Sequence, residues 1–218
     1  MRSMVSIALW SFFVSGAFVA CGGSTTANGA GTGTVSGAVS GTSFTAASAF
    51  AAYQAGASTS SCNVGPDGGT GDCTTVSSGQ AIIIAFTNQS TLSCSTLVAD
   101  ITAKSEPTIA NLDALALIVA NDDANLTPGA YPIATSGNAT SGSFAEFQTT
   151  SATCGMGVSQ QSTAGSVTLT SISASAVAGS YTVTFGTEGT FSGTFDVDIC
   201  SIPEGGLSDR VSSTGCAK

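Results

Sequence analysis

The chain has 218 residues, of which 4 are Lys or Arg, 13 are Asp or Glu and none is His, so its formal net charge is −9 and only 8% of its residues are charged. An ordinary soluble domain is about 25% charged. Nucleic-acid binding requires clustered Lys and Arg, so four scattered basic residues exclude it. The absence of His removes the Ser-His and Cys-His pairs that activate most catalytic nucleophiles, and it removes imidazole ligation of metals.

The first 20 residues follow the order of a secretory signal. Arg2 precedes an apolar stretch from Val5 to Val14, and small residues follow at 15–17. The apolar stretch is shorter than the roughly 20 residues that a membrane-spanning helix needs. We therefore expect residues 1–20 to be a signal peptide and the protein to be exported.

The end of this signal, residues 18–21 (FVAC), resembles the lipobox of bacterial lipoproteins. In a lipobox, a small residue precedes a cysteine that is lipidated and becomes the first residue of the mature chain. The resemblance implies that Cys21 carries lipid and anchors the protein to the cell envelope. Gly22 is not the Asp that favours inner-membrane retention in many lipoproteins, so we expect the outer membrane. Cleavage after Ala17, with Cys21 left as a thiol or disulfide partner, is the alternative.

The cysteine count agrees with a lipidated Cys21, because six cysteines then remain in a compartment where disulfides persist. The candidate disulfide partners are Cys62, Cys73, Cys94, Cys154, Cys200 and Cys216. Cys62 and Cys73 bracket a loop of Gly, Pro and Asp and are the easiest local pair, but spacing alone leaves every connectivity open. Without His or a Cys-x-x-Cys motif we expect no zinc site.

Composition divides the exported chain into a tether and one domain. Residues 21–34 are rich in Gly, Ser and Thr and have no large apolar side chain before Val35, so we expect a flexible tether. Residues 35–218 show no second linker and have a length that suits one domain.

Alternating apolar and polar residues predict that this domain is mainly β. The clearest signal is an antiparallel hairpin, in which the alternating stretches 181–185 and 191–199 flank a turn bounded by Gly186 and Gly189. Gly193 falls on the inward series, which indicates a bulge or a close backbone approach. Further strands are expected at 81–86, 143–148 and 167–170, and two more between Val35 and Phe50. The expected fold is an antiparallel β-sandwich or barrel-like domain stapled by disulfides.

Two segments have a helical pattern. Residues 92–102 are predicted to form one short helix that carries Cys94 and ends before Pro107. Residues 112–120 (LDALALIVA) fit either a helix or a buried strand. We favour the strand, because a turn at 121–125 and a new strand at Tyr131 then follow naturally.

The arrangement as a whole resembles a group of uncharacterised bacterial lipoproteins. The matching features are the lipobox-like segment 18–21, the Val-x-Gly-x-Val-x-Gly-x-x-Phe stretch from Val35 to Phe44, the Pro-Gly-x-Tyr from Pro128 to Tyr131, and the Gly-Thr-Phe-Asp-x-x-x-Cys from Gly193 to Cys200. The resemblance implies a predominantly β domain and brings no established activity.

Asp196 and Asp198 form the strongest pair of carboxylates. Two residues apart on one strand, they share a face at roughly 7 Å between Cα atoms. Such a pair can serve a glycosidase as proton donor and nucleophile. The wet face of an amphipathic strand explains the pair equally well and is our preferred interpretation. The exported chain also has no Trp to form a sugar platform, because Trp10 lies in the signal.

Two loops contain oxygen donors of the kind that Ca²⁺ binds. These donors are Asp67 and Asp72 in PDGGTGD, and Asn121, Asp122, Asp123 and Asn125 in NDDAN. Asn, Asp and Gly also dominate ordinary turns, so we predict no metal.

The sequence therefore predicts a lipid-anchored envelope or surface protein that acts as a structural or binding module. Its partner would be an envelope protein or a glycan, with no cofactor and no nucleic acid. The alternative is a carboxylate-dependent hydrolase that acts on carbohydrate.

Overall fold

The computed structural model describes residues 31–55, 58–64, 70–77, 80–96, 98, 109–121, 125–133 and 141–201, with the backbone alone at 54, 55, 58–64, 70–77 and 141. The predicted signal peptide, Cys21 and Cys216 lie outside these ranges, as does most of the predicted tether.

Strands dominate the described residues, as predicted. In chain order they are β1 (Thr32–Gly33), β2 (Ser36–Val39), β3 (Ser48–Ala55), β4 (Ser58–Val64), β5 (Thr70–Ser77), β6 (Gln80–Thr87), β7 (Asp113–Asn121), β8 (Gly129–Pro132), β9 (Ser141–Thr150), β10 (Met156–Gln161), β11 (Ala164–Ile172), β12 (Ala176–Thr184) and β13 (Gly189–Cys200). Helical residues among those described are confined to 94–96 and Val98, within the predicted helix at 92–102.

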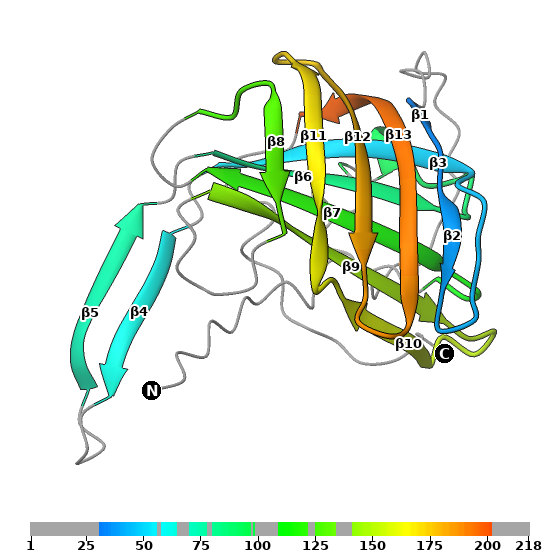
Figure 1. The fold of residues 1–218 in the computed structure, drawn as a ribbon, viewed down its shortest axis with the longest axis horizontal. Helices are drawn as coiled ribbons and strands as arrows, with labels where there is room; N and C mark the ends of the chain where they lie inside the picture. Colours follow the sequence, from blue (N-terminus) through cyan, green and yellow to red (C-terminus); the bar gives the residue numbers. More distant parts are fainter. Residues whose placement is uncertain are drawn as a thin grey trace.

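One curled sheet contains eleven of these strands, and its main path runs β10-β9-β7-β6-β3-β13-β12-β11-β8 (Figure 1). The contact of β13 with β3 is parallel, and the other strand pairs along this path are antiparallel. The predicted hairpin at 181–199 is confirmed as β12 and β13, in register from Thr184 opposite Thr190 to Ala176 opposite Asp198. The segment predicted at 112–120 is a strand, β7 (Asp113–Asn121), so the helical alternative is wrong.

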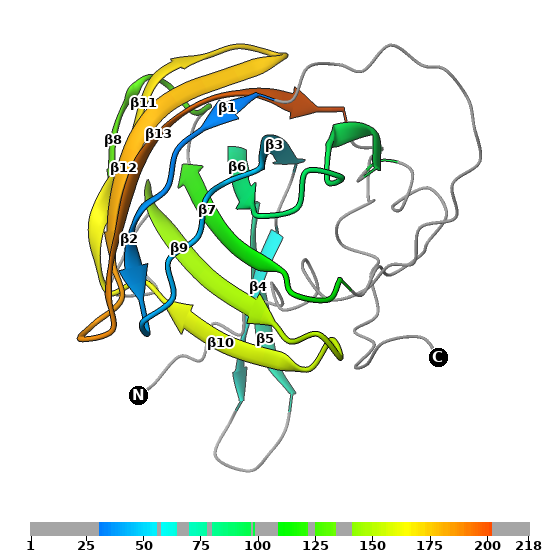
Figure 2. The same cartoon turned by 90° about the vertical axis from the view of Figure 1, so that its right-hand side faces the viewer.

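The sheet curls back on itself, which makes the domain barrel-like (Figure 2). The chain turns at Ser162, between β10 and β11. The backbone N–H of Ser162 donates to the carbonyl oxygen of Ala145 on β9 at 2.8 Å, and the Ala145 N–H donates to Ser162 Oγ at 2.8 Å. Beside this corner, Ile133 forms a parallel bridge with Ser143, whose hydroxyl donates to the Tyr131 carbonyl at 2.7 Å. Backbone pairing and hydroxyl bonds therefore close the curl together.

Aromatic side chains fill the interior of the curled sheet. Phe147 and Phe191 pack edge to face with ring centroids 5.0 Å apart, and Phe44 from the loop before β3 stacks on Phe147 at 5.8 Å. Phe86 packs on Tyr181 at 5.3 Å. Offset and edge-to-face pairs of this kind add to the stabilisation from burial.

The chain enters the sheet earlier than the composition predicted. Thr32 and Gly33, placed in the tether by their lack of large side chains, form β1 against Asp196 and Phe195 of β13. Backbone pairing needs no apolar side chain, and a Cβ at Gly33 would come within 2.7 Å of the Phe86 ring. Small residues fit here because β1 lies close to the core.

The outer face of the sheet differs from one side of the curl to the other. On β6, β7 and β9 it is mostly buried: Ile83, Ala116 and Glu146 are 5%, 2% and 5% exposed, and Ile118 and Phe144 are half-buried. On β12 and β13 it is open, with Thr182 and Thr194 exposed. β6 is consequently buried on both faces, as its continuous apolar run predicted.

The remaining two strands, β4 and β5, form a separate two-stranded sheet. β3 and β6 pair as far as Ala55 opposite Gln80, and β4 and β5 pair from Ser58 opposite Ser77 onward. Figures 1 and 2 show this ribbon extending away from the curled sheet.

Candidate functional site

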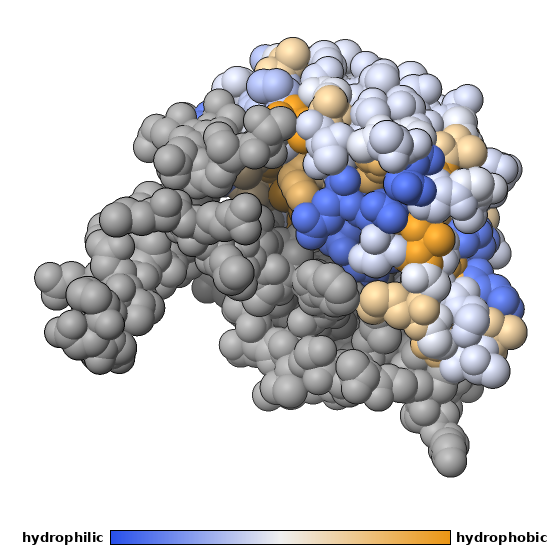
Figure 3. All heavy atoms as spheres, turned by 60° about the horizontal axis from the view of Figure 1, so that its bottom comes forward, coloured by the Kyte–Doolittle hydropathy of each residue, from blue (hydrophilic) through white to orange (hydrophobic). Residues whose placement is uncertain are grey.

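Strands β11, β12 and β13 present rows of hydroxyl groups on their open outer face. Each strand alternates apolar side chains inward with Ser or Thr outward, because successive residues point to opposite faces. We call this surface the hydroxyl face; it consists of Ser166, Thr168, Ser180, Thr182, Thr184, Thr190, Ser192 and Thr194, all exposed or half-buried. In Figure 3 the upper part of the described surface is mostly pale, which is the colour of Ser and Thr on this hydropathy scale.

The strand register lines these residues up across the sheet. Ser166, Thr182 and Ser192 form one row, because Thr182 is the register partner of both other residues. In the next row Thr184 and Thr190 share a hydrogen bond of 3.0 Å between their hydroxyl oxygens. At the edge, the Thr34 and Thr194 hydroxyls are 3.2 Å apart. Such a surface can donate and accept hydrogen bonds without bringing charge.

Asp196 and Asp198 continue the outward series of β13 beyond this face. Asp196 is exposed between Ala178 of β12 and Thr32 of β1, and Asp198 is half-buried beside Ala176. The structure thus places the predicted pair on one face, as expected, with small uncharged neighbours in register. This is the geometry of a solvated strand face.

The other acids with described side chains lie apart from this pair. Asp113, at the start of β7, accepts a hydrogen bond from Asn88 Nδ2 at 2.9 Å. Burial raises the pKa of this carboxyl above its ordinary value, and the hydrogen bond from Asn88 offsets part of that rise. Glu188 accepts from the Ser40 hydroxyl at 2.9 Å, near the turn between β12 and β13. Among the described residues, no three Cys, Asp or Glu side chains gather closely enough to hold a metal ion.

The two loops with oxygen donors, for which turns were preferred to a Ca²⁺ site, lie mostly outside the described residues. Asp67, Asp122 and Asp123 lie outside the described residues, and Asp72 is described in backbone only, within β5. Asn121 ends β7, and Asn125 is exposed ahead of β8.

Glu146 is a buried acid that the sequence analysis did not single out. It lies on the buried outer face of β9, opposite Ala116 of β7, and accepts a hydrogen bond from Gln148 Nε2. Both side chains are buried, at 5% and 6% exposure. Burial raises the pKa of Glu146, and the Gln148 hydrogen bond offsets part of that rise. The sequence signal for this buried acid is the position of Glu146 within the apolar segment FAEF at 144–147.

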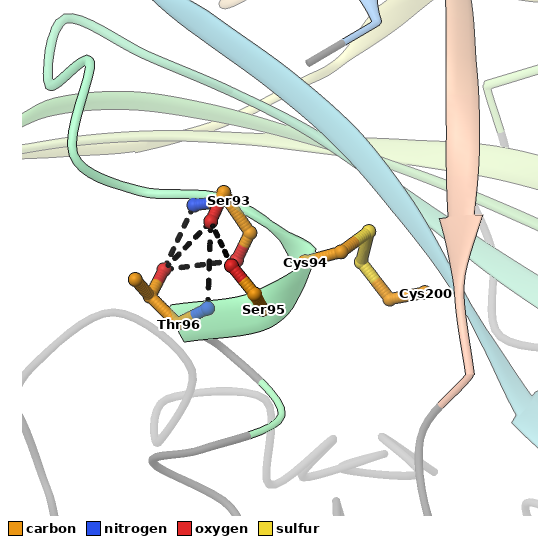
Figure 4. Close-up of a disulfide and its surroundings, with 5 residues drawn as sticks. All are labelled: Ser93, Cys94, Ser95, Thr96 and Cys200. Carbon is orange, nitrogen blue, oxygen red and sulfur yellow. Dashed lines mark hydrogen bonds between the residues drawn. A yellow bond between two sulfur atoms is a disulfide. The ribbon is translucent and has the colours of Figure 1, made fainter. Parts of the chain in front are cut away.

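A disulfide joins Cys94 to Cys200, the last residue of β13, with 5.0 Å between Cα atoms (Figure 4). The helical turn at Cys94 is held by its own hydroxyls: the Ser93 N–H donates to Thr96 Oγ1 at 2.8 Å, and the Thr96 N–H donates back to Ser93 Oγ at 3.4 Å. This reciprocal bonding satisfies amide groups at the start of the turn. Both cysteines were candidates, but spacing could not pair them.

The other predicted cysteines are described in part. Cys62 and Cys73 are direct register partners on β4 and β5, where the backbone alone is described. Cys154 is disulfide-bonded.

The helical residues in the described part of the chain do not form a helix long and apolar enough to cross a membrane.

Comparisons of this chain with protein families, with curated proteins and with solved structures find no match.

Proposed function

We propose that the protein is a lipid-anchored protein of the bacterial outer membrane whose curled β domain acts as a structural or binding module. The anchor is supported by the lipobox-like residues 18–21 and by the even number of cysteines that remain without Cys21. A Gly-rich connection from Cys21 to Thr32 would hold the domain about 20 Å from the membrane.

The hydroxyl face is the observation that carries the binding role. Its eight Ser and Thr side chains form an open surface, whereas the outer face on β6, β7 and β9 is mostly buried. All four basic residues, Arg2, Lys104, Arg210 and Lys218, lie outside the described ranges. An uncharged array of donors and acceptors suits a neutral polar partner, and a glycan of the envelope presents the matching hydroxyl groups.

The alternative of a carbohydrate hydrolase has less support. A glycosidase needs two carboxylates that flank one bond of the substrate. Asp196 and Asp198 lie side by side along one strand instead, and the other described acids, Asp113, Glu146 and Glu188, lie on other parts of the fold.

The anchor is tested by comparing the wild-type protein with Cys21→Ser in a Gram-negative host. We expect wild type to partition into detergent and to start at a lipid-modified Cys21, and Cys21→Ser to be released as a soluble protein. Gly22→Asp tests the membrane assignment, because it should move the protein to the inner membrane. Equal solubility of wild type and Cys21→Ser, or a mature chain that begins at Phe18, would overturn the anchor.

The binding role is tested by co-sedimentation with isolated cell-wall glycan. Thr182→Glu places a charge in the middle of the hydroxyl face, and Thr187→Glu places the same charge in the exposed turn between β12 and β13. We expect Thr182→Glu alone to weaken sedimentation with the glycan. Equal retention of both variants would show that the hydroxyl face is not the binding surface.

A further inference from the structure

The ribbon of β4 and β5 is separated from the rest of the described fold. It continues the hairpin of β3 and β6, but among the described elements only β4 and β5 pair with each other in its sheet, and no other strand makes more than marginal contact with either. Figures 1 and 2 show it projecting away from the curled sheet. Isolated two-stranded ribbons are at best marginally stable in water, whereas sheets of three or more strands hold their structure more readily.

The sequence of the ribbon gives it no apolar face. One face carries the register pairs Ser58 with Ser77, Ser60 with Thr75, and Cys62 with Cys73; the other carries Thr59 with Val76 and Ser61 with Thr74. Both faces are therefore dominated by hydroxyl residues, and neither matches the apolar outer face of β6. Because neither face is apolar, the part of the ribbon that can pair with another chain is its backbone edge.

The edge of β4 lacks two of the features that usually prevent edge-to-edge pairing, charge and Pro. Natural edge strands are protected by Lys, Pro, inward charges or bulges. β4 (STSSCNV) has no charged residue and no Pro; its pairing with β5 is regular from Ser58 to Cys62 and shifts in register between Cys62 and Val64. β5 carries Asp72, and the edge strand β10 has an irregularity in its register between Met156 and Ser159. Of these three strands, β4 alone combines a regular stretch of five residues, Ser58–Cys62, with the absence of charge and Pro from the whole strand.

We propose that β4 pairs antiparallel with β4 of a second copy of this chain, which joins the two ribbons into one four-stranded sheet. A strand paired antiparallel with its own copy satisfies two-fold symmetry, so this contact closes as a dimer. Two chains of net charge −9 repel one another, and the uncharged β4 is a surface where close approach adds no like-charge contact. The added strands supply the pairing that the isolated ribbon lacks.

Sedimentation equilibrium over a series of protein concentrations tests the pairing. The exported protein carries Cys21→Ser throughout, so that a lipid cannot cause association. Ser60→Lys places a charge at the centre of the β4 edge, and Ser159→Lys is the matched control on β10. A third variant replaces residues 56–79 by Asn-Gly, a two-residue turn that joins the register partners Ala55 and Gln80.

We expect a monomer–dimer equilibrium for the parent protein and for Ser159→Lys. Ser60→Lys should weaken dimerisation by about tenfold or more, because edge lysines oppose pairing, and the variant without the ribbon should be monomeric with an unchanged curled sheet by circular dichroism. A monomeric parent, undiminished dimers in Ser60→Lys or in the shortened variant, or a loss of dimers in Ser159→Lys would each overturn the proposal.

Discussion

The phenolic hydroxyl of Tyr181 donates a hydrogen bond of 2.9 Å to the carbonyl oxygen of Thr34. Gly193 makes this contact feasible, because it is the register partner of Tyr181 on β13 and has no side chain. A Cβ at Gly193 would overlap the Thr34 carbonyl and lie 3.0 Å from the Tyr181 hydroxyl. The close backbone approach predicted at Gly193 is confirmed, and through it the segment beside β1 is held to the β12–β13 hairpin.

Gly193→Ala and Tyr181→Phe should each lower the free energy of unfolding. The alanine methyl group overpacks the contact, at a cost of about 1–3 kcal/mol. Tyr181→Phe removes a partly buried hydrogen bond to the Thr34 carbonyl, at a cost of about 1 kcal/mol. Because both substitutions disturb one contact, the double variant should lose less than the sum of the two. Urea denaturation measures all three.

Thr182→Ala is the control for these variants, because Thr182 is exposed on the opposite face of β12. It should stay within about 0.5 kcal/mol of wild type. Wild-type stability in Gly193→Ala would contradict the role given to this glycine.

Glu146→Gln should stabilise the protein at neutral pH. Burial raises the pKa of Glu146 in the folded state, so the folded protein binds this proton more readily than the unfolded chain does. The contribution of Glu146 to stability is therefore most favourable below the ordinary pKa of glutamate, and it is lost as pH rises through the raised value. The neutral amide of Gln avoids the buried charge, and we expect a gain on the order of 1 kcal/mol.

The measurement is the free energy of unfolding at pH 4.5 and pH 7.5. We expect the advantage of Glu146→Gln over wild type to be present at the higher pH and to shrink at the lower one. Glu188→Gln is the control: its carboxylate accepts from Ser40 at the surface, so no gain is expected. A lower stability of Glu146→Gln than of wild type at pH 7.5 would contradict the prediction that the buried charge of Glu146 is destabilising.

The sequence predicted those strands that have at least one apolar face. Alternation located β12 and β13 because apolar side chains point into the core and hydroxyls point outward, and the continuous apolar run at 81–86 located β6 because both of its faces are buried. The same rule could not find β1, since Thr32 and Gly33 join the sheet through backbone bonds alone. It could not find the β4–β5 ribbon either, where both faces are polar.

The hydroxyl face was not predicted as a site, although the outward position of its residues follows from the alternation along each strand. Asp196 and Asp198 share one face, as a period of two requires. The alignment of Thr182 with Ser166 and Ser192 depends on the register of three strands, which a single sequence does not specify. Glu146 was missed because a polar residue on a strand is ordinarily exposed, and its burial depends on which outer face of the curl it occupies.

Loss of the Cys94–Cys200 disulfide should strongly destabilise the domain. The two cysteines are 106 residues apart, and cross-linking a loop of this length stabilises by about 4–5 kcal/mol in the chain-entropy model. The bond also holds the end of β13, where Cys200 pairs with Ala52 of β3. We expect the double variant Cys94→Ala/Cys200→Ala to unfold at a much lower urea concentration than wild type. An equal midpoint for the two proteins would contradict the prediction.

The six cysteines of the domain should form three disulfides that leave Cys21 out. Cys94 pairs with Cys200, and Cys62 lies opposite Cys73 in an antiparallel register, where Cα atoms fall within the range of a disulfide. Cys154 is disulfide-bonded. If the four cysteines above pair as expected and Cys21 carries the proposed lipid, Cys216 is the partner expected for Cys154.

Mass spectrometry of peptides from a non-reducing digest tests this connectivity. We expect three linked peptide pairs, Cys62 with Cys73, Cys94 with Cys200 and Cys154 with Cys216, and an N-terminal peptide in which Cys21 carries acyl chains. The reduced digest is the control, because the linked pairs should separate there while the lipid remains on Cys21. A peptide that links Cys154 to Cys21 would contradict both this connectivity and the proposed anchor, since a sulfur engaged in a disulfide cannot carry lipid.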